Sequence, residues 1–157
     1  MTRLNYWKSQ SLPAVDQKAI SDIEKYGVHL VEVPEDEDGP GFVYTVGLFD
    51  RYSHPEIIIV GLDSELSHDI LNGLAEEVAE GAVFRDQDGH DGILEDYTCV
   101  FLDVLKDNYP DTLGYAAWYY GGTDFPVLQC VWPDMDGSYP WDGAATDEFI
   151  EDQPILA

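Results

Sequence analysis

Apolar and polar positions along the chain alternate in a way that predicts a β-hairpin followed by a buried strand. Residues 28–33 alternate between the two kinds of side chain, as a half-buried strand does, and residues 42–48 are expected to form the return strand. Residues 34–41 between them combine proline, glycine and four consecutive acids, and such a segment forms a turn. Residues 56–62 form an almost continuous apolar run, which is typical of a central strand.

Helical spacing of apolar residues predicts three helices. The first begins at Pro13 and ends at Gly27, and the second begins at Asp63 or Ser64 and ends at Gly81. The apolar face of the second helix consists of Leu66, Ile70, Leu71, Leu74 and Val78. We expect a third helix over 108–120, and further strands over 97–105 and 125–132. Segments 49–54 and 86–92 are expected to be a polar connection and a Gly/Asp loop.

This order of elements predicts an α+β fold in a single domain, residues 1–157. Strands that follow one another early in the chain favour a mixed or largely antiparallel sheet, here of about five strands with about three helices packed on it. Residues 1–12 are expected to form a loosely packed N-terminal arm. Residues 134–157 are expected to form an irregular acidic tail that follows the surface, anchored by Trp141, Phe149 and Ile155–Leu156.

Charge is the feature that narrows the class of partner. Seven Lys and Arg residues stand against 32 Asp and Glu residues, so the formal net charge is −25. Such a field repels nucleic-acid phosphates and anionic membranes, and it attracts basic proteins. A role in solubility alone would also account for it. The chain has no long apolar run and no signal-peptide pattern at its start, so we expect a cytoplasmic protein.

The acids are unevenly placed, and their positions predict a binding surface. After Lys106 the sequence has ten acids, many aromatic residues and no further Lys or Arg. Aromatic rings beside carboxylates suit contacts with lysine and arginine. The predicted partner-binding residues are Glu35, Asp36, Glu37, Asp38, Asp134, Asp136, Trp141 and Asp142.

Candidate chemistry is sparse. The acidic loops that begin at Asp86 and Asp134 lack the ligand spacing of a calcium-binding loop, and no nucleophile or phosphate-binding motif is present. We therefore predict no catalytic residue, no metal and no cofactor. Cys99 and Cys130 lie in apolar runs and are expected to be buried free thiols. His54 could serve as a general base, although such a histidine more often fixes a turn.

Several strings are similar to those of the bacterial family known as domain of unknown function 4262. They are Tyr-Thr-Val-Gly-Leu at 44–48, His-Pro-Glu at 54–56, Trp-Pro-Asp at 132–134 and Pro-Trp at 140–141. The resemblance extends from about residue 20 to the C-terminus. If the family shares a pocket, the residues of this chain that would line it are Tyr44, Thr45, Arg51, His54 and Trp132. Some families of small bacterial domains of this kind act as immunity proteins beside secreted toxins.

Three functions remain open at this point. The favoured one is an acidic protein-binding domain, of the immunity or antitoxin type, that occludes a basic toxin or another cationic protein. The second is a small enzyme or small-molecule-binding domain with a pocket near His54 and Arg51. The third is a stand-alone regulatory module, for which the acidity would reflect solubility or a halophilic origin.

Overall fold

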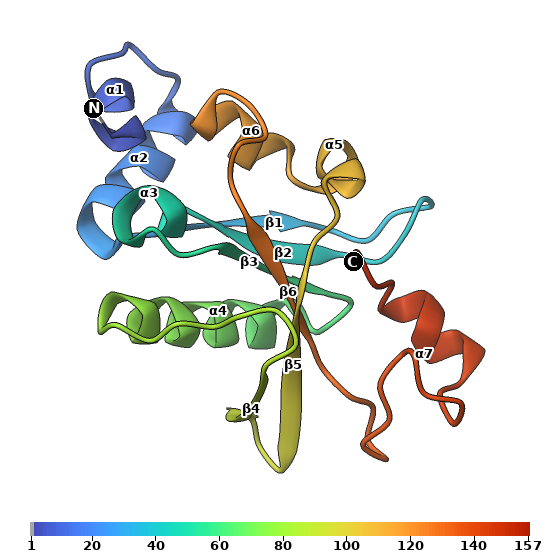
Figure 1. Ribbon diagram of the computed structural model, residues 1–157. Helices are drawn as coiled ribbons and strands as arrows, with labels where there is room; N and C mark the ends of the chain where they lie inside the picture. The colour runs from blue at the N-terminus through green and yellow to red at the C-terminus, as the bar shows by residue number, and fades with distance from the viewer. Residues whose placement is uncertain (1) are drawn as a thin grey trace.

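The computed structural model describes residues 2–157 and is built around one six-stranded sheet (Figure 1). The strand order is β1-β2-β3-β6-β5-β4, and all neighbours are antiparallel except the parallel pair β3 and β6. In chain order the strands are β1 (His29–Val33), β2 (Phe42–Val46), β3 (Glu56–Val60), β4 (Gly89–Leu94), β5 (Tyr97–Asp103) and β6 (Val127–Val131). The predicted hairpin over 28–48 is confirmed as β1 and β2.

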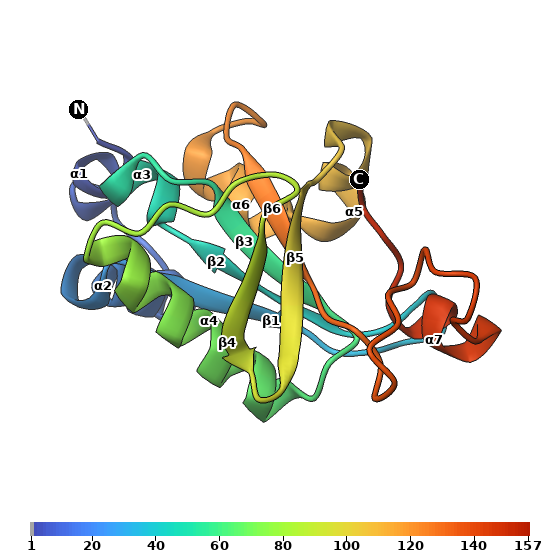
Figure 2. The ribbon, with the colours of Figure 1, turned by 60° about the horizontal axis from the view of Figure 1, so that its bottom comes forward.

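Helices cover both faces of this sheet. They are α1 (Arg3–Lys8), α2 (Ala14–Tyr26), α3 (Leu48–Tyr52), α4 (Ser64–Ala79), α5 (Tyr109–Thr112), α6 (Gly114–Tyr120) and α7 (Asp147–Asp152), with a 3-10 turn η1 (Lys106–Asn108) before α5. Helix α4 lies across one face, and α2, α5 and α6 lie across the other (Figures 1 and 2).

The central strand β3 shows why two layers of helices are needed. Ile57 and Ile59 pack toward α4, whereas Ile58 packs toward the opposite helices, and all three are fully buried. Burying a side chain of this size stabilises the fold by about 1.5–3 kcal/mol. A strand that is apolar on both sides must be covered on both sides, as the unbroken run in the sequence predicted.

The predicted class, an α+β domain with a mixed sheet, is confirmed, but the number of elements is not. In the part of the chain that the structure describes, six strands form where about five were expected, and seven helices form where about three were expected. The extra strand β4 lies at the sheet edge and overlaps the predicted Gly/Asp loop, and none of its six positions is buried. The predicted polar connection contains α3. The predicted helix over 108–120 is split, because Leu113 leaves the helical backbone conformation before Gly114.

The N-terminal segment differs from the loosely packed arm that we expected. Helix α1 buries Leu4, and the Trp7 ring stacks on Trp118 with 4.2 Å between centroids. The Trp7 indole also donates a hydrogen bond of 2.8 Å to the Tyr119 carbonyl. Apolar contacts of this kind were hidden in the sequence because their partners lie more than a hundred residues away.

The C-terminal tail is fastened to the end of β6. The buried Gln153 side chain accepts a hydrogen bond from Trp132 N and donates one to Trp132 O. Phe149 and Leu156 are also buried, in agreement with two of the three expected anchors, whereas Trp141 is 49% exposed. Cys99 and Cys130 are buried and free, as predicted.

Candidate functional site

Charge is distributed unequally between the two ends of the molecule. Five of the seven Lys and Arg residues lie in α1, α2 and α3, which gather at one end (Figure 1). The turn between β1 and β2 lies at the opposite end, beside α5 and α7 (Figures 1 and 2). Lys106 in η1 donates a hydrogen bond of 2.7 Å to the Thr123 carbonyl. The hairpin turn therefore projects from the part of the molecule with few cations.

The hairpin turn is shaped by its own backbone. Asp36 N donates to Gly39 O at 3.1 Å, and Asp38 N donates to the Asp36 carboxylate at 2.8 Å. The two arms approach so closely at Gly41 that a Cβ there would lie 2.9 Å from Glu35 N. This tight turn leaves all four acids, Glu35 to Asp38, exposed to solvent.

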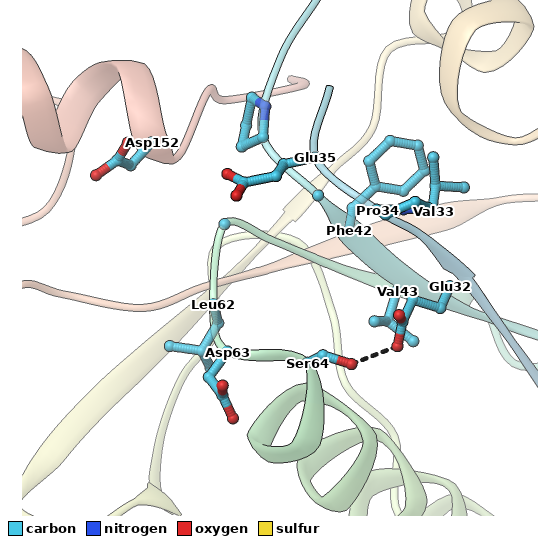
Figure 3. Close-up of a pocket in the computed structure, with 13 residues that line it drawn as sticks. Glu32, Val33, Pro34, Glu35, Phe42, Val43, Leu62, Asp63, Ser64 and Asp152 are labelled. Carbon is cyan, nitrogen blue, oxygen red and sulfur yellow. Dashed lines mark hydrogen bonds between the residues drawn. The ribbon is translucent and has the colours of Figure 1, made fainter. Parts of the chain in front are cut away.

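One cavity of about 450 Å³ lies on the α4 side of this turn (Figure 3). Four carboxylates line it, from β1, the turn, the N-cap of α4 and α7: Glu32, Glu35, Asp63 and Asp152. Two of these groups have local partners. Asp63 accepts a hydrogen bond of 3.1 Å from Leu66 N, and Glu32 accepts one from the Ser64 hydroxyl. We call this hollow the α4-side cavity.

A second cavity of about 500 Å³ lies on the α5 side of the same turn. Its carboxylates are Asp36 and Asp38 from the turn and Asp111 from α5. The rest of its wall is mostly apolar, with Val33, Phe42, Val60 and Leu156 beside three prolines. We call this hollow the α5-side cavity.

We call the two cavities and the turn between them the hairpin end. Seven carboxylates line the cavities, and among the residues that the structure describes no Lys, Arg or His lines either one. The His68 ring, which lines neither cavity, has its Nδ1 3.6 Å from Glu32. Within residues 2–157, no group of three or more His, Cys, Asp or Glu side chains is arranged to hold a metal ion. The seven carboxylates are distributed around the walls of the two cavities and do not gather in one cluster.

The second predicted group of partner-binding residues lies elsewhere, in the turn after β6. Asp134 accepts hydrogen bonds of 2.9 Å from Asp136 N and Ser138 N, so its carboxylate stabilises that turn. Asp142 accepts one of 2.8 Å from Tyr139 N. Trp141 stacks on the Tyr139 ring with 5.0 Å between centroids. None of Asp134, Asp136, Trp141 and Asp142 lines either cavity of the hairpin end.

Four of the five residues of the predicted pocket, Tyr44, Thr45, His54 and Trp132, are held by structural contacts. They line neither cavity of the hairpin end. The Tyr44 hydroxyl accepts a hydrogen bond of 3.1 Å from Tyr115 N, and burial raises the pKa of Tyr44 to about 12. The Trp132 indole donates to Val60 O at 2.9 Å, and Arg51 is exposed in α3. Thr45 donates to Glu56.

His54, the candidate general base, has both ring nitrogens engaged with the backbone. Nδ1 donates to the Pro55 carbonyl at 2.8 Å, and Nε2 accepts from Phe84 N at 3.0 Å. The ring is buried, and burial lowers its pKa below the usual 6.5. A neutral, doubly hydrogen-bonded ring fixes the chain between α3 and β3 and leaves no nitrogen free to accept a substrate proton.

Sequence reasoning missed Glu56, the fully buried first residue of β3. Its carboxylate accepts hydrogen bonds from Gly47 N, Leu48 N and Phe49 N at 3.0, 3.1 and 3.2 Å, which are the free amides at the start of α3. It also accepts from the Thr45 hydroxyl at 2.8 Å and from the Tyr120 hydroxyl.

Burial raises the pKa of the Glu56 carboxyl, and the hydrogen bonds oppose this effect. The one signal in the sequence was an acid at the start of an otherwise apolar strand. Glu56 lines neither cavity, so its contacts define it as a cap for α3 that ties β2, β3 and α6 together.

The fold and the site together define a single α+β domain in which seven carboxylates line the two cavities of the hairpin end. The family model described as Domain of unknown function (DUF4262) matches residues 22–146, and the chain belongs to this family. Neither a curated protein nor a solved structure matches the chain. Among the described residues, no helix has the length and apolar character needed to cross a membrane.

Proposed function

We propose that this domain binds a cationic protein through the hairpin end. The observation that carries the proposal is the arrangement of charge: seven carboxylates line two cavities on either side of one exposed acidic turn, and within residues 2–157 no cationic side chain lines them. Carboxylates held on a preformed surface attract a positively charged partner over a distance and fix its orientation on arrival.

The most specific form of the proposal is an immunity or antitoxin-type inhibitor in the bacterial cytoplasm. A toxin that acts on nucleic acid needs a basic surface for phosphate contacts, and the hairpin end would occlude that surface by charge complementarity. The net charge of −25 supports this form because it favours rapid encounter with such a partner.

Co-purification tests the proposal, with the protein encoded by the neighbouring gene as the probe. We expect a basic protein to be retained, with an affinity that falls steeply when salt rises from about 50 to about 500 mM, since salt screens exposed charges. An affinity that stays constant over this range would contradict binding driven by charge.

Matched variants then test the place of binding. The first neutralises the turn with Glu35→Gln, Asp36→Asn, Glu37→Gln and Asp38→Asn. The control neutralises four exposed acids that line neither cavity, with Glu76→Gln, Glu80→Gln, Asp96→Asn and Asp124→Asn. Both variants change the net charge equally, so a surface-specific interaction weakens only in the first. Equal weakening in both would mean that net charge alone, and not the hairpin end, binds the partner.

A further inference from the structure

The α5-side cavity shares the apolar residues Val33, Pro34, Pro40 and Phe42 with the α4-side cavity and adds Val60, Pro154 and Leu156 of its own. Val60 and Leu156 are almost fully buried and lie at the end of β3 and near the C-terminus, and Phe42 opens β2. Pro34, Pro40 and Pro154 add further apolar surface, and proline has no amide proton to offer a ligand. Such a wall suits a hydrocarbon chain.

The carboxylates of this cavity come from two segments far apart in sequence. Asp36 and Asp38 belong to the hairpin turn, and Asp111 belongs to α5. Among the described residues, no Lys, Arg or His forms a salt bridge with any of these three side chains. A cation placed between the turn and α5 would offset the repulsion between their charges.

We propose that the α5-side cavity is a socket for one arginine side chain of the cationic partner, an inference that rests on the proposed function. The methylene stem of the arginine packs on Phe42 and Leu156, and its guanidinium group meets the carboxylates of the turn and of α5. A cavity of about 500 Å³ has room for one such side chain. An apolar wall with charged groups at its rim matches a side chain that is apolar along its stem and charged at its tip.

Arginine fits this cavity better than lysine. The guanidinium group is planar and weakly hydrated, stacks on aromatic rings and has five donors that can reach carboxylates on two sides. Phe42 provides the ring, and the turn and α5 provide the two sides. The lysine ammonium is compact and strongly hydrated, so it gains less from a partly apolar socket.

The test uses three pentapeptides as probes: acetyl-Gly-Gly-Arg-Gly-Gly-amide and its lysine and citrulline counterparts. Citrulline keeps the shape of arginine without the charge. Each peptide is titrated into the full chain while the amide chemical shifts of the protein are recorded. The arginine peptide should change the shifts of Phe42, Thr112 and Leu156. Smaller shifts should follow with lysine, and none with citrulline. Equal shifts with citrulline, or arginine-dependent shifts elsewhere only, would overturn the inference.

Two substitutions on one segment supply a matched control. Asp111→Asn removes a carboxylate of the cavity and should weaken binding of the arginine peptide about two- to fivefold, as expected for an exposed ion pair. Asp107→Asn removes an exposed carboxylate that lines neither cavity and should have no effect. Phe42→Leu keeps an apolar wall but removes the aromatic ring, so it should reduce the difference in affinity between the arginine peptide and the lysine peptide. Equal affinities for the two aspartate variants would count against the socket.

The same variants separate this inference from the proposed function. A partner that binds Asp111→Asn as it binds the unaltered chain, but does not bind the turn-neutralised protein, would overturn the socket and leave the proposed function standing. A partner that binds the turn-neutralised protein undiminished would overturn the proposed function itself.

Discussion

Replacing Glu56 should unfold the region around α3 more effectively than any other single change to a carboxylate. In Glu56→Ala, the buried amides of Gly47 and Leu48, the partly buried amide of Phe49 and two hydroxyl groups lose their acceptor. Each unsatisfied buried group costs about 1–3 kcal/mol, so the loss for the two buried amides alone is at least about 2 kcal/mol. This is a large part of the 5–15 kcal/mol that is typical of a domain.

Glu56→Gln refines the argument because it keeps the shape of the side chain. In the native carboxylate, one oxygen accepts from Thr45 and Leu48, and the other accepts from Gly47, Phe49 and Tyr120. Glutamine has only one acceptor oxygen, so its NH₂ group must face one of these two sets of donors. The Thr45 hydroxyl can rotate to accept, whereas the backbone amides cannot, so the nitrogen should take the position that faces Thr45 and Leu48. One amide then lacks a partner, and we expect a loss of about 1–3 kcal/mol.

Urea unfolding followed by tryptophan fluorescence measures both losses, with Glu76→Gln on the exposed face of α4 as the control. The expected order of stability is the unaltered chain and the control, then Glu56→Gln, then Glu56→Ala. If Glu56→Ala unfolds within about 0.5 kcal/mol of the control, the range typical of surface substitutions, the capping role is refuted.

Three further changes have definite expected outcomes. Burial lowers the pKa of His54 below 6.5, so as the pH falls the unfolded chain binds a proton at this ring before the folded chain does. The free energy of unfolding should therefore decrease below about pH 6.5, and urea unfolding of His54→Gln should show a smaller decrease over the same range. Gly61→Ala would place a Cβ 1.9 Å from the Asp152 carbonyl at φ +78°, so it should displace α7 and lower the melting temperature. Asp50→Ala removes the acceptor for the first two amides of α1, at 2.9 Å each, and should speed their hydrogen exchange while the exchange of α4 stays unchanged.

Elements with a local signal were predicted well. The cap Asp63 and the apolar positions Ile70 to Val78 predicted α4, and the acidic turn between the alternating segment 28–33 and the return strand predicted the hairpin. The exposed acids of that turn were expected, because a loop rich in proline, glycine and charge has no place in a core. Leu66 is the exception on α4, since it is 37% exposed.

Features that depend on distant partners were missed. Glu56 is held by residues 45–49 and by Tyr120, and His54 is held by Phe84, thirty residues later. The two cavities exist because α5, α7 and the start of α4 converge on the hairpin turn, and spacing along the chain does not encode that convergence. The turn after β6 looked equally acidic in sequence, but none of its aspartates lines either cavity.

The central claim is that the hairpin end is the surface that collects cations. A small cationic nitroxide and a neutral nitroxide of the same size test this claim directly. For each amide, the paramagnetic relaxation enhancement caused by the cationic probe is divided by that caused by the neutral probe, and the ratio reports how strongly that part of the surface attracts cations. The account predicts the highest ratios at residues 35–38 and at Asp111, and the lowest ratios along α1 and α2. Ratios that are uniform over the surface, or highest at the α1 and α2 end, would contradict it.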